Sequence, residues 1–189
     1  EISALVPQAD DWSSWDDTYQ YLVDSNTQFR DSILHKHSVF ELMSLDLLYF
    51  FDNSGKVVWS VVYDRETGEE VKLTELSDVS LSPDHPLTAL NNKELGYKGL
   101  MMTSRGPMLL VAKPSLDGFG NGPRHGTLLF GRFLDKPALS RIAKQAQVEL
   151  DVFPVQAEAL DAEHAAVVIE LGRSSKSVIR ADDTVNRVY

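Results

Sequence analysis

The sequence of 189 residues contains no cysteine. Disulfide bonds, thiolate metal ligands and thiol nucleophiles are therefore excluded. The absence is compatible with a chain that enters an oxidising compartment. Cations are also scarce, because 18 Lys and Arg are outnumbered by 28 Asp and Glu, which gives a net charge of −10. A nucleic-acid partner is not expected, since binding to phosphates requires a basic surface.

Long apolar runs are missing as well. No segment approaches the roughly 18–20 apolar residues that cross a bilayer, and no secretory signal is recognisable at the start. The chain begins at Glu1 without methionine and ends at Tyr189 inside an apparent strand. We therefore interpret it as an excised fragment, so the absence of a membrane segment here says nothing about the parent protein. Repeats and low-complexity segments are also absent, so a folded domain is expected.

The first 35 residues carry a helical pattern. Apolar side chains at alternating spacings of three and four predict a helix over residues 5–35. The stripe consists of Trp12, Trp15, Tyr19, Leu22, Phe29 and Ile33, and the polar Asn26 interrupts it. The capping pattern of Ser25–Gln28 allows the helix to restart after Asp24. A second capping pattern, Ser38–Glu41, predicts a short helix through Leu45.

Apolar runs separated by turn residues predict an antiparallel sheet. The strands are expected over residues 46–51, 56–63, 99–104, 107–114 and 127–134, with irregular chain over 71–92. The central hairpin is Gly106–Asp135, whose strands flank a loop rich in Gly, Pro, Asn and Asp. Both strands are almost continuously apolar, so the sheet should be covered on much of both faces. Gly131 leaves room for a bulge or a close approach by another segment.

The C-terminal part is expected to begin with a helix that Asp135 caps and that holds Pro137 in its first turn. Strand candidates follow over residues 148–155, 167–171 and 178–188, with a surface helix or loop over 157–166. The element order predicts an α+β fold, with a long N-terminal helix packed on a central antiparallel sheet. We expect a single domain over residues 1–189, divided into a helical part (1–45), a sheet (46–155) and an incomplete C-terminal part (156–189).

Several clusters could carry chemistry, and each has a simpler interpretation. His35 and His37 could share a metal only on extended chain, and otherwise form a surface pair. The acids Asp10, Asp11, Asp16 and Asp17 could gather a hard cation, but acids are also favoured in early helical turns. The alternating Gly118, Gly120 and Gly122 are followed by a strand, so loop flexibility is favoured over a phosphate cradle. Ser115, Asp117 and His125 lack a Gly-x-Ser-x-Gly elbow, so nucleophilic catalysis is unsupported.

Ligand binding needs aromatic walls with a few placed charges. Lys113 and Arg132 are charges inside apolar strands, where they must pair, reach solvent or meet a ligand. The candidate ligand-binding residues are Asp16, Tyr19, Tyr49, Trp59, Lys113 and Arg132. No catalytic residue, metal site or cofactor is assigned.

Several motifs together resemble the CHASE type-four domain family. The segment from Asp11 to Tyr19 resembles the Trp-Asp-Asp-x-Tyr opening of that family. Further similar segments are residues 52–58, the turn and strand at Gly99, and residues 122–135 with their Gly-Pro, Gly-Thr-Leu and Gly-Arg elements. Order and spacing agree over about residues 11–155. Lys113 departs from the small residue expected before Pro114.

The resemblance implies a periplasmic, PAS/Cache-like sensor domain of a bacterial transmembrane receptor. Such a domain is held between two membrane helices and precedes a diguanylate cyclase, phosphodiesterase or histidine kinase module, which links it to cyclic di-GMP or phosphoryl signalling. The fragment itself would be non-enzymatic, would bind an unidentified small molecule, and would relay ligand binding through the membrane-proximal helix as a homodimer. The alternatives are a structural dimerisation spacer and a small metal-dependent hydrolase that uses the acidic cluster with His35 and His37.

Overall fold

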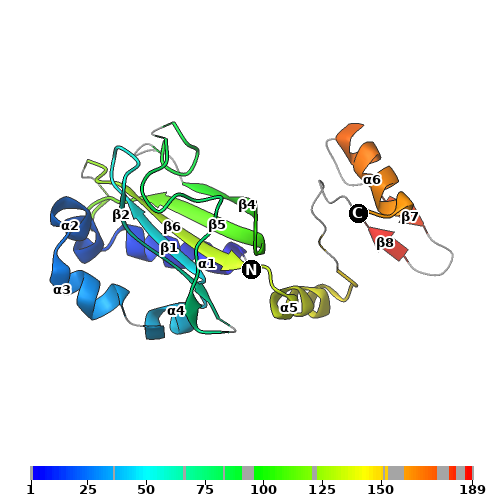
Figure 1. The fold of residues 1–189 in the computed structure, drawn as a ribbon, viewed down its shortest axis with the longest axis horizontal. Coiled ribbons are helices and arrows are strands. Elements are labelled where there is room, and N and C mark those ends of the chain that lie inside the picture. The colour runs from blue at the N-terminus through cyan, green and yellow to red at the C-terminus, as the bar shows by residue number, and fades with distance from the viewer. Residues whose placement is uncertain are drawn as a thin grey trace. The chain divides into compact units, whose positions relative to one another are not determined.

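The computed structural model describes residues 2–35, 37–65, 67–82, 84–90, 96–120, 123–150, 152, 160–173, 179–181 and 186–188. The chain divides into two compact units, Glu1–Leu150 and Asp151–Tyr189. The first unit contains a six-stranded sheet and the helices around it (Figure 1). Among the described residues, no helix has the length and apolar character needed to cross a membrane.

The sheet has the order β3-β2-β1-β6-β5-β4. Its strands are β1 (Leu47–Phe51), β2 (Val57–Asp64), β3 (Glu69–Glu70), β4 (Tyr97–Thr103), β5 (Gly106–Pro114) and β6 (Thr127–Phe133). Every neighbouring pair is antiparallel, and β5 with β6 forms the predicted central hairpin. The predicted α+β class with an antiparallel sheet is confirmed.

Both faces of the sheet are covered, as the apolar strands predict. Because side chains alternate between faces, Leu48 and Phe50 of β1 enter one core cluster and Tyr49 enters the other. Helices cover the first face. The second face is covered by Leu73, Leu76, Leu87 and Leu90, which lie in the irregular segment between β3 and β4.

Gly131 of β6 faces the loop-covered core, opposite Leu47 of β1. A Cβ there would lie 2.8 Å from both Leu47 Cβ and Met108 Sδ. The predicted close approach is confirmed, and β6 pairs with β1 without a bulge.

The N-terminal helical region is divided into several helices. They are α1 (Ile2–Ser13), α2 (Asp16–Asp24), α3 (Thr27–Phe29), a π-helical turn (Arg30–Leu34) and α4 (His37–Met43). The predicted continuous helix breaks at Trp15, which is extended, and again at Ser25, which has a φ of 53°. Asn26 caps the restart, because its side chain accepts a hydrogen bond from the Phe29 amide at 2.8 Å. The predicted restart is therefore confirmed with a cap one residue later, and the short helix after His37 is confirmed too.

The aromatic stripe packs on the sheet. Helix α1 lies along β5 and β6, and the ring of Trp12 lies 5.8 Å from that of Phe130 in an edge-on contact. Trp12, Leu22 and Phe29 belong to the helix-side core. Most of the aromatic stripe is therefore packed in the core of the domain.

Helix α5 (Lys136–Ala146) follows β6 and begins as the sequence predicts. The Asp135 side chain accepts a hydrogen bond from the Ala138 amide at 2.7 Å, and Pro137 lies in the first turn. The strand predicted over 148–155 is not found in its described part, because residues 148–150 and 152 are in no strand. A left-handed Gln147 ends the helix there and redirects the chain. Residues 151 and 153–155 lie outside the described residues.

The second unit contains α6 (Ala162–Arg173) and a pair of short antiparallel strands, β7 (Ile179–Ala181) and β8 (Asn186–Val188). The strand predicted over 167–171 is wrong, because these residues continue α6. Asp161 accepts a hydrogen bond from the His164 amide at 2.8 Å and so caps the helix. A capped run through Ala165 and Ala166 outweighs the β-branched residues that indicated a strand.

Candidate functional site

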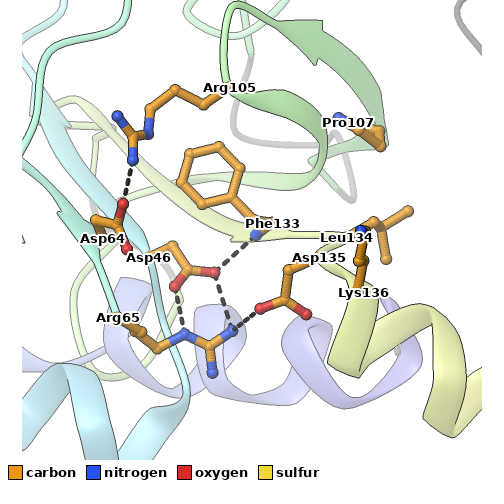
Figure 2. A pocket seen from close by; sticks show the side chains of 9 residues that line it. All are labelled: Asp46, Asp64, Arg65, Arg105, Pro107, Phe133, Leu134, Asp135 and Lys136. Atoms are coloured by element: carbon orange, nitrogen blue, oxygen red, sulfur yellow. Dashed lines mark hydrogen bonds and ion pairs between the residues drawn. The ribbon is translucent and has the colours of Figure 1, made fainter. Parts of the chain in front are cut away.

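A cavity of about 460 Å³ lies at one end of the sheet. Antiparallel strands in this order place the starts of β1 and β5 at the same end as the last residues of β2, β4 and β6. Charged residues stand at most of these strand ends, so the topology gathers them. The lining residues are Asp46, Asp64, Arg65, Arg105, Pro107, Phe133, Leu134, Asp135 and Lys136 (Figure 2), and we call this cavity the strand-end pocket.

Asp46 is the buried centre of the strand-end pocket. Its main chain is fixed in the sheet, because its amide donates to the Gly131 carbonyl (2.9 Å) and its carbonyl accepts from the Tyr63 amide (2.7 Å). Its carboxylate accepts a hydrogen bond from the Phe133 amide at 2.7 Å. It also accepts two bonds from Arg65, through Nε and through Nη2, the latter at 3.2 Å.

The protonation of Asp46 follows from this burial. Removal from water is the largest effect and raises the pKa of the carboxyl, and nearby Asp135 raises it further. The hydrogen bonds from Arg65 and the Phe133 amide act in the opposite direction. Burial wins, so the pKa of Asp46 lies above its ordinary value.

Arg65 joins the sheet to the start of α5. Its Nη2 lies 3.7 Å from Asp135 Oδ2 while the same guanidinium is bonded to Asp46. Asp135 is the residue that caps α5 through its other oxygen. One arginine thus links Asp46, which directly precedes β1, to the helix that follows β6.

A second ion pair and an apolar wall complete the strand-end pocket. Arg105, in the turn between β4 and β5, forms an ion pair with Asp64 at the end of β2. Figure 2 shows Arg105 on one side of the Phe133 ring and Arg65 with Asp46 on the other. The apolar wall comes from Pro107, Phe133 and Leu134. The pocket therefore offers guanidinium groups beside an aromatic ring.

A larger cavity of about 730 Å³ lies where the segment after β3 passes beside β2. Its walls are Tyr49, residues 60–62 of β2, Glu70 of β3, and residues 71–74 and 76–78 that follow β3. Burial raises the pKa of the Tyr49 hydroxyl, which the Ser60 side chain partly offsets by hydrogen bonding. At the mouth, Lys72 Nζ and Asp78 Oδ2 form an exposed ion pair at 2.6 Å.

The structure distributes the predicted ligand-binding residues over both faces of the sheet. Tyr49 lies in the loop-covered core and Trp59 packs against the helix-side core. Asp16 and Tyr19 lie together on α2, beside the loop before β6. Asp16 Oδ1 accepts a hydrogen bond from the Gly118 amide at 2.9 Å, and the Tyr19 ring lies 4.6 Å from the ring of His125. Their role in ligand binding stays a prediction.

Lys113 and Arg132 form bonds inside the domain. Lys113 Nζ lies 2.5 Å from Asp10 Oδ1 of α1. Arg132 donates to the main-chain carbonyls of Ser44 (2.7 Å) and Met43 (2.9 Å) at the end of α4. Both embedded charges thus fasten helices to the sheet, and they do not converge on one cavity with Tyr49.

The predicted metal alternatives can be placed only in part. His35 packs near Trp59, with ring centroids 6.3 Å apart, and the His37 side chain lies outside the described part of the chain. Within the described residues, no group of three or more His, Asp or Glu side chains is arranged to hold a metal ion. Gly118 serves as the partner of Asp16, and Gly122 is outside the described residues.

Sequence reasoning missed the residues of the strand-end pocket. The sequence pattern predicts Asp135 only as a helix cap and assigns no site role to Asp46, Arg65 or Arg105. A signal was present, because charges directly border three predicted strands whose antiparallel order brings these borders together. The pairing of these charges between neighbouring strand ends depends on strand register and on side-chain length. Spacing in the sequence does not define either of them.

This structure defines a class of protein: an α+β domain with helices on one face of an antiparallel sheet and a charged pocket at the strand ends. Residues 1–152 match the CHASE4 domain, and the chain belongs to this family. It is therefore a sensory domain of a signalling receptor, and the predicted family and the predicted α+β class are confirmed.

Two further similarities accompany the family match. The chain is 27% identical over 193 aligned residues to the methanogenesis regulatory histidine kinase FilI of Methanothrix harundinacea (strain 6Ac). The match covers 100% of this chain. It covers only 21% of the length of that relative. A crystal structure of a domain from a sensory box/GGDEF family protein of Vibrio parahaemolyticus has a TM-score of 0.49 and 18% identity, covering 71% of this chain and 55% of the other.

Proposed function

We propose that this domain is the periplasmic ligand-sensing part of a transmembrane receptor whose output is a histidine kinase or a cyclic di-GMP enzyme. The fragment would be non-enzymatic, and a membrane tether and homodimerisation in the parent protein belong to the same proposal. Support comes from the family and from the relative's name as a histidine kinase. An extracytoplasmic location also agrees with the absence of cysteine.

The observation that carries the proposal is the position of Arg65. It is bonded to Asp46, which is fixed in the sheet, and it lies beside Asp135, which caps α5. A ligand in the strand-end pocket would compete for Arg65 and change how firmly the start of α5 is held. A small molecule that binds one arrangement better than another shifts the population between them. Helix α5 would then carry the change out of the first unit.

The sensing role is tested by screening the domain and the whole receptor with the same compounds. A thermal-shift screen of organic acids, amino acids, polyamines and sugars should find a class that raises the melting temperature, because a ligand that binds only folded protein stabilises it. In membranes, the same class should change the output of the whole receptor. A structural spacer would show neither response, and this outcome would contradict the proposal.

The location is tested by labelling. The domain has no cysteine, so Phe119→Cys introduces a single thiol on a side chain that is 88% exposed. We expect a membrane-impermeant maleimide to label this variant of the whole receptor in spheroplasts, and the receptor without the substitution serves as the control for other thiols. Labelling that appears only after the cells are lysed would contradict a periplasmic location.

A further inference from the structure

The carboxylates of the strand-end pocket are occupied by the protein's own amides. Asp46 accepts from the Phe133 amide (2.7 Å), and Asp135 accepts from the Ala138 amide (2.7 Å). Asp64 accepts from the Thr67 amide at 3.3 Å with one oxygen and binds Arg105 with the other. Each acid therefore has a structural function that a cationic ligand would disturb.

The cations of the strand-end pocket have donors to spare. A guanidinium carries five N–H donors in a planar fork. Among the described residues, the Arg105 side chain donates to Asp64 alone, through Nη2, and it is 40% exposed. Lys136, in the first turn of α5, is exposed and adds three donors. The hydrogen-bonding groups of the pocket that remain unused are therefore donors. Such a set suits an anion.

The apolar wall restricts the anion further. Phe133, Pro107 and Leu134 line the same cavity of about 460 Å³. A hydrated inorganic anion gains nothing from such a wall, whereas the hydrocarbon part of an organic acid is removed from water by it. Arginine also matches the planar carboxylate through two parallel hydrogen bonds.

We propose that the strand-end pocket binds a small organic carboxylate through Arg105 and Lys136, with the hydrocarbon part against Phe133. This inference rests on the proposed sensing function and names the ligand class. The bound carboxylate would compete with Asp64 for Arg105 and would lie close to the Arg65–Asp135 contact. Binding would therefore change the contacts at the cap of α5, where the proposed signal begins.

The test measures binding by calorimetry and by thermal shift on the 189-residue chain at constant ionic strength. The probes are sodium propionate and sodium succinate, with inorganic phosphate and methylammonium chloride as comparison compounds. We expect a carboxylate to bind and to raise the melting temperature, and phosphate and methylammonium to do neither. Equal binding of phosphate would overturn the inference, and so would binding of the amine alone.

Two variants assign the binding to the strand-end pocket. Arg105→Gln should weaken carboxylate binding about tenfold or more, the change expected when a hydrogen bond to a charged group is lost. Lys72→Gln is the matched control, because Lys72 is an exposed cation at the other cavity, and it should leave the affinity unchanged. Unchanged affinity in Arg105→Gln, or a loss in Lys72→Gln, would overturn the assignment.

Lys136→Gln gives a second measurement that does not depend on the fold of the Arg105 variant. It removes an exposed side chain of the same pocket, and it should also weaken carboxylate binding. Unchanged affinity in this variant would remove Lys136 from the site. The two proposals can fail separately. If another class of compound changes the receptor output while carboxylates do not bind, the carboxylate inference fails and the sensing function stands.

Discussion

Asp46 shows how a single buried acid organises the strand-end pocket. Its carboxylate joins the Phe133 amide of β6 to Arg65 after β2, and its main chain belongs to the sheet. Burial makes the ionised form costly, and these partners only partly offset that cost. Removing the carboxylate takes the acceptor from the Phe133 amide and leaves Arg65 with Asp135 alone, and an unsatisfied donor costs more than a hydrogen bond contributes.

We therefore expect Asp46→Ala to lower the free energy of unfolding by about 3 kcal/mol, the size seen when one partner of a buried, hydrogen-bonded ion pair is removed. Asp78→Ala is the control, because its pair with Lys72 is exposed, with side chains 52% and 87% accessible. The control should lower stability far less, because an exposed ion pair contributes little in water. Urea unfolding measures both, and similar losses in the two variants would contradict this role of Asp46.

Asp52 gives a pH dependence whose sign can be worked out. Burial, the largest single effect, acts to raise the pKa of this carboxyl, but hydrogen bonds from the Ser54 amide (2.8 Å), the Ser54 hydroxyl (2.6 Å) and the Lys56 amide (3.0 Å) together hold the pKa below its ordinary value of 3.8. The folded state therefore releases this proton more readily than the unfolded state. Its stabilisation is complete above the unfolded pKa and is lost as the pH falls through the folded value.

The stability difference between the wild type and Asp52→Asn should thus be largest near neutral pH and shrink below about pH 4. Asp46→Asn should behave in the opposite way, because the pKa of Asp46 is raised. For that variant the contribution of the titrating group is present at low pH and is lost as the pH rises through the folded pKa. Urea unfolding at a series of pH values tests both, and parallel pH profiles for the two variants would contradict the assignment.

Gly126 is required by backbone conformation and by space. Its φ is +145°, and a Cβ there would lie 2.0 Å from the Phe51 carbonyl oxygen. We expect Gly126→Ala to cost more than about 3 kcal/mol, because backbone strain of about 1–3 kcal/mol adds to a clash with fixed main chain. Gly68→Ala is the control, since its φ is +71° with nothing within 4 Å, and it should cost about 1 kcal/mol. Equal losses in thermal unfolding would contradict the steric argument.

At the scale of elements, the sheet was predictable and the breaks in the helices were not. Continuous apolar runs such as Leu47–Phe51 identify buried strands, and the apolar-glycine-apolar pattern of Gly106–Asp135 identifies the hairpin. The stripe from Trp12 to Ile33 predicts which helical face is buried. It does not predict where the helix is interrupted. The break at Trp15 lets α2 leave the axis of α1, and no proline or glycine marks it.

The start of α5 is the element most directly tied to the strand-end pocket. Asp135→Ala removes the cap and the contact with Arg65, so stability should fall by about 1 kcal/mol, the usual cost of losing an N-cap. Hydrogen exchange should rise at the Ala138 amide, which loses its acceptor. Ser140→Ala, an exposed position in the same helix, is the control and should leave exchange at Ala138 unchanged. Unchanged exchange in Asp135→Ala would contradict the capping role.

At the scale of the whole molecule, the main sheet and its two core clusters lie in the first unit. All six strands of the main sheet and both core clusters lie within Glu1–Leu150, and the family match ends at residue 152. Strand β6 pairs with both β1 and β5, so it holds the two halves of the sheet together. These pairings join residues far apart in the sequence, which explains why the strand-end pocket could be derived only after the strand order was known.

A fragment of residues 1–150 should therefore fold alone, with one cooperative thermal transition. Its midpoint should lie within about 4 °C of the transition of the same unit in the full chain, a difference of about 1 kcal/mol at this size. A fragment of residues 1–130 is the matched control, because it cuts β6 and leaves β1 and β5 without part of their shared partner. It should show no cooperative transition by circular dichroism. Loss of the transition in the longer fragment would mean that the first unit depends on residues beyond Leu150.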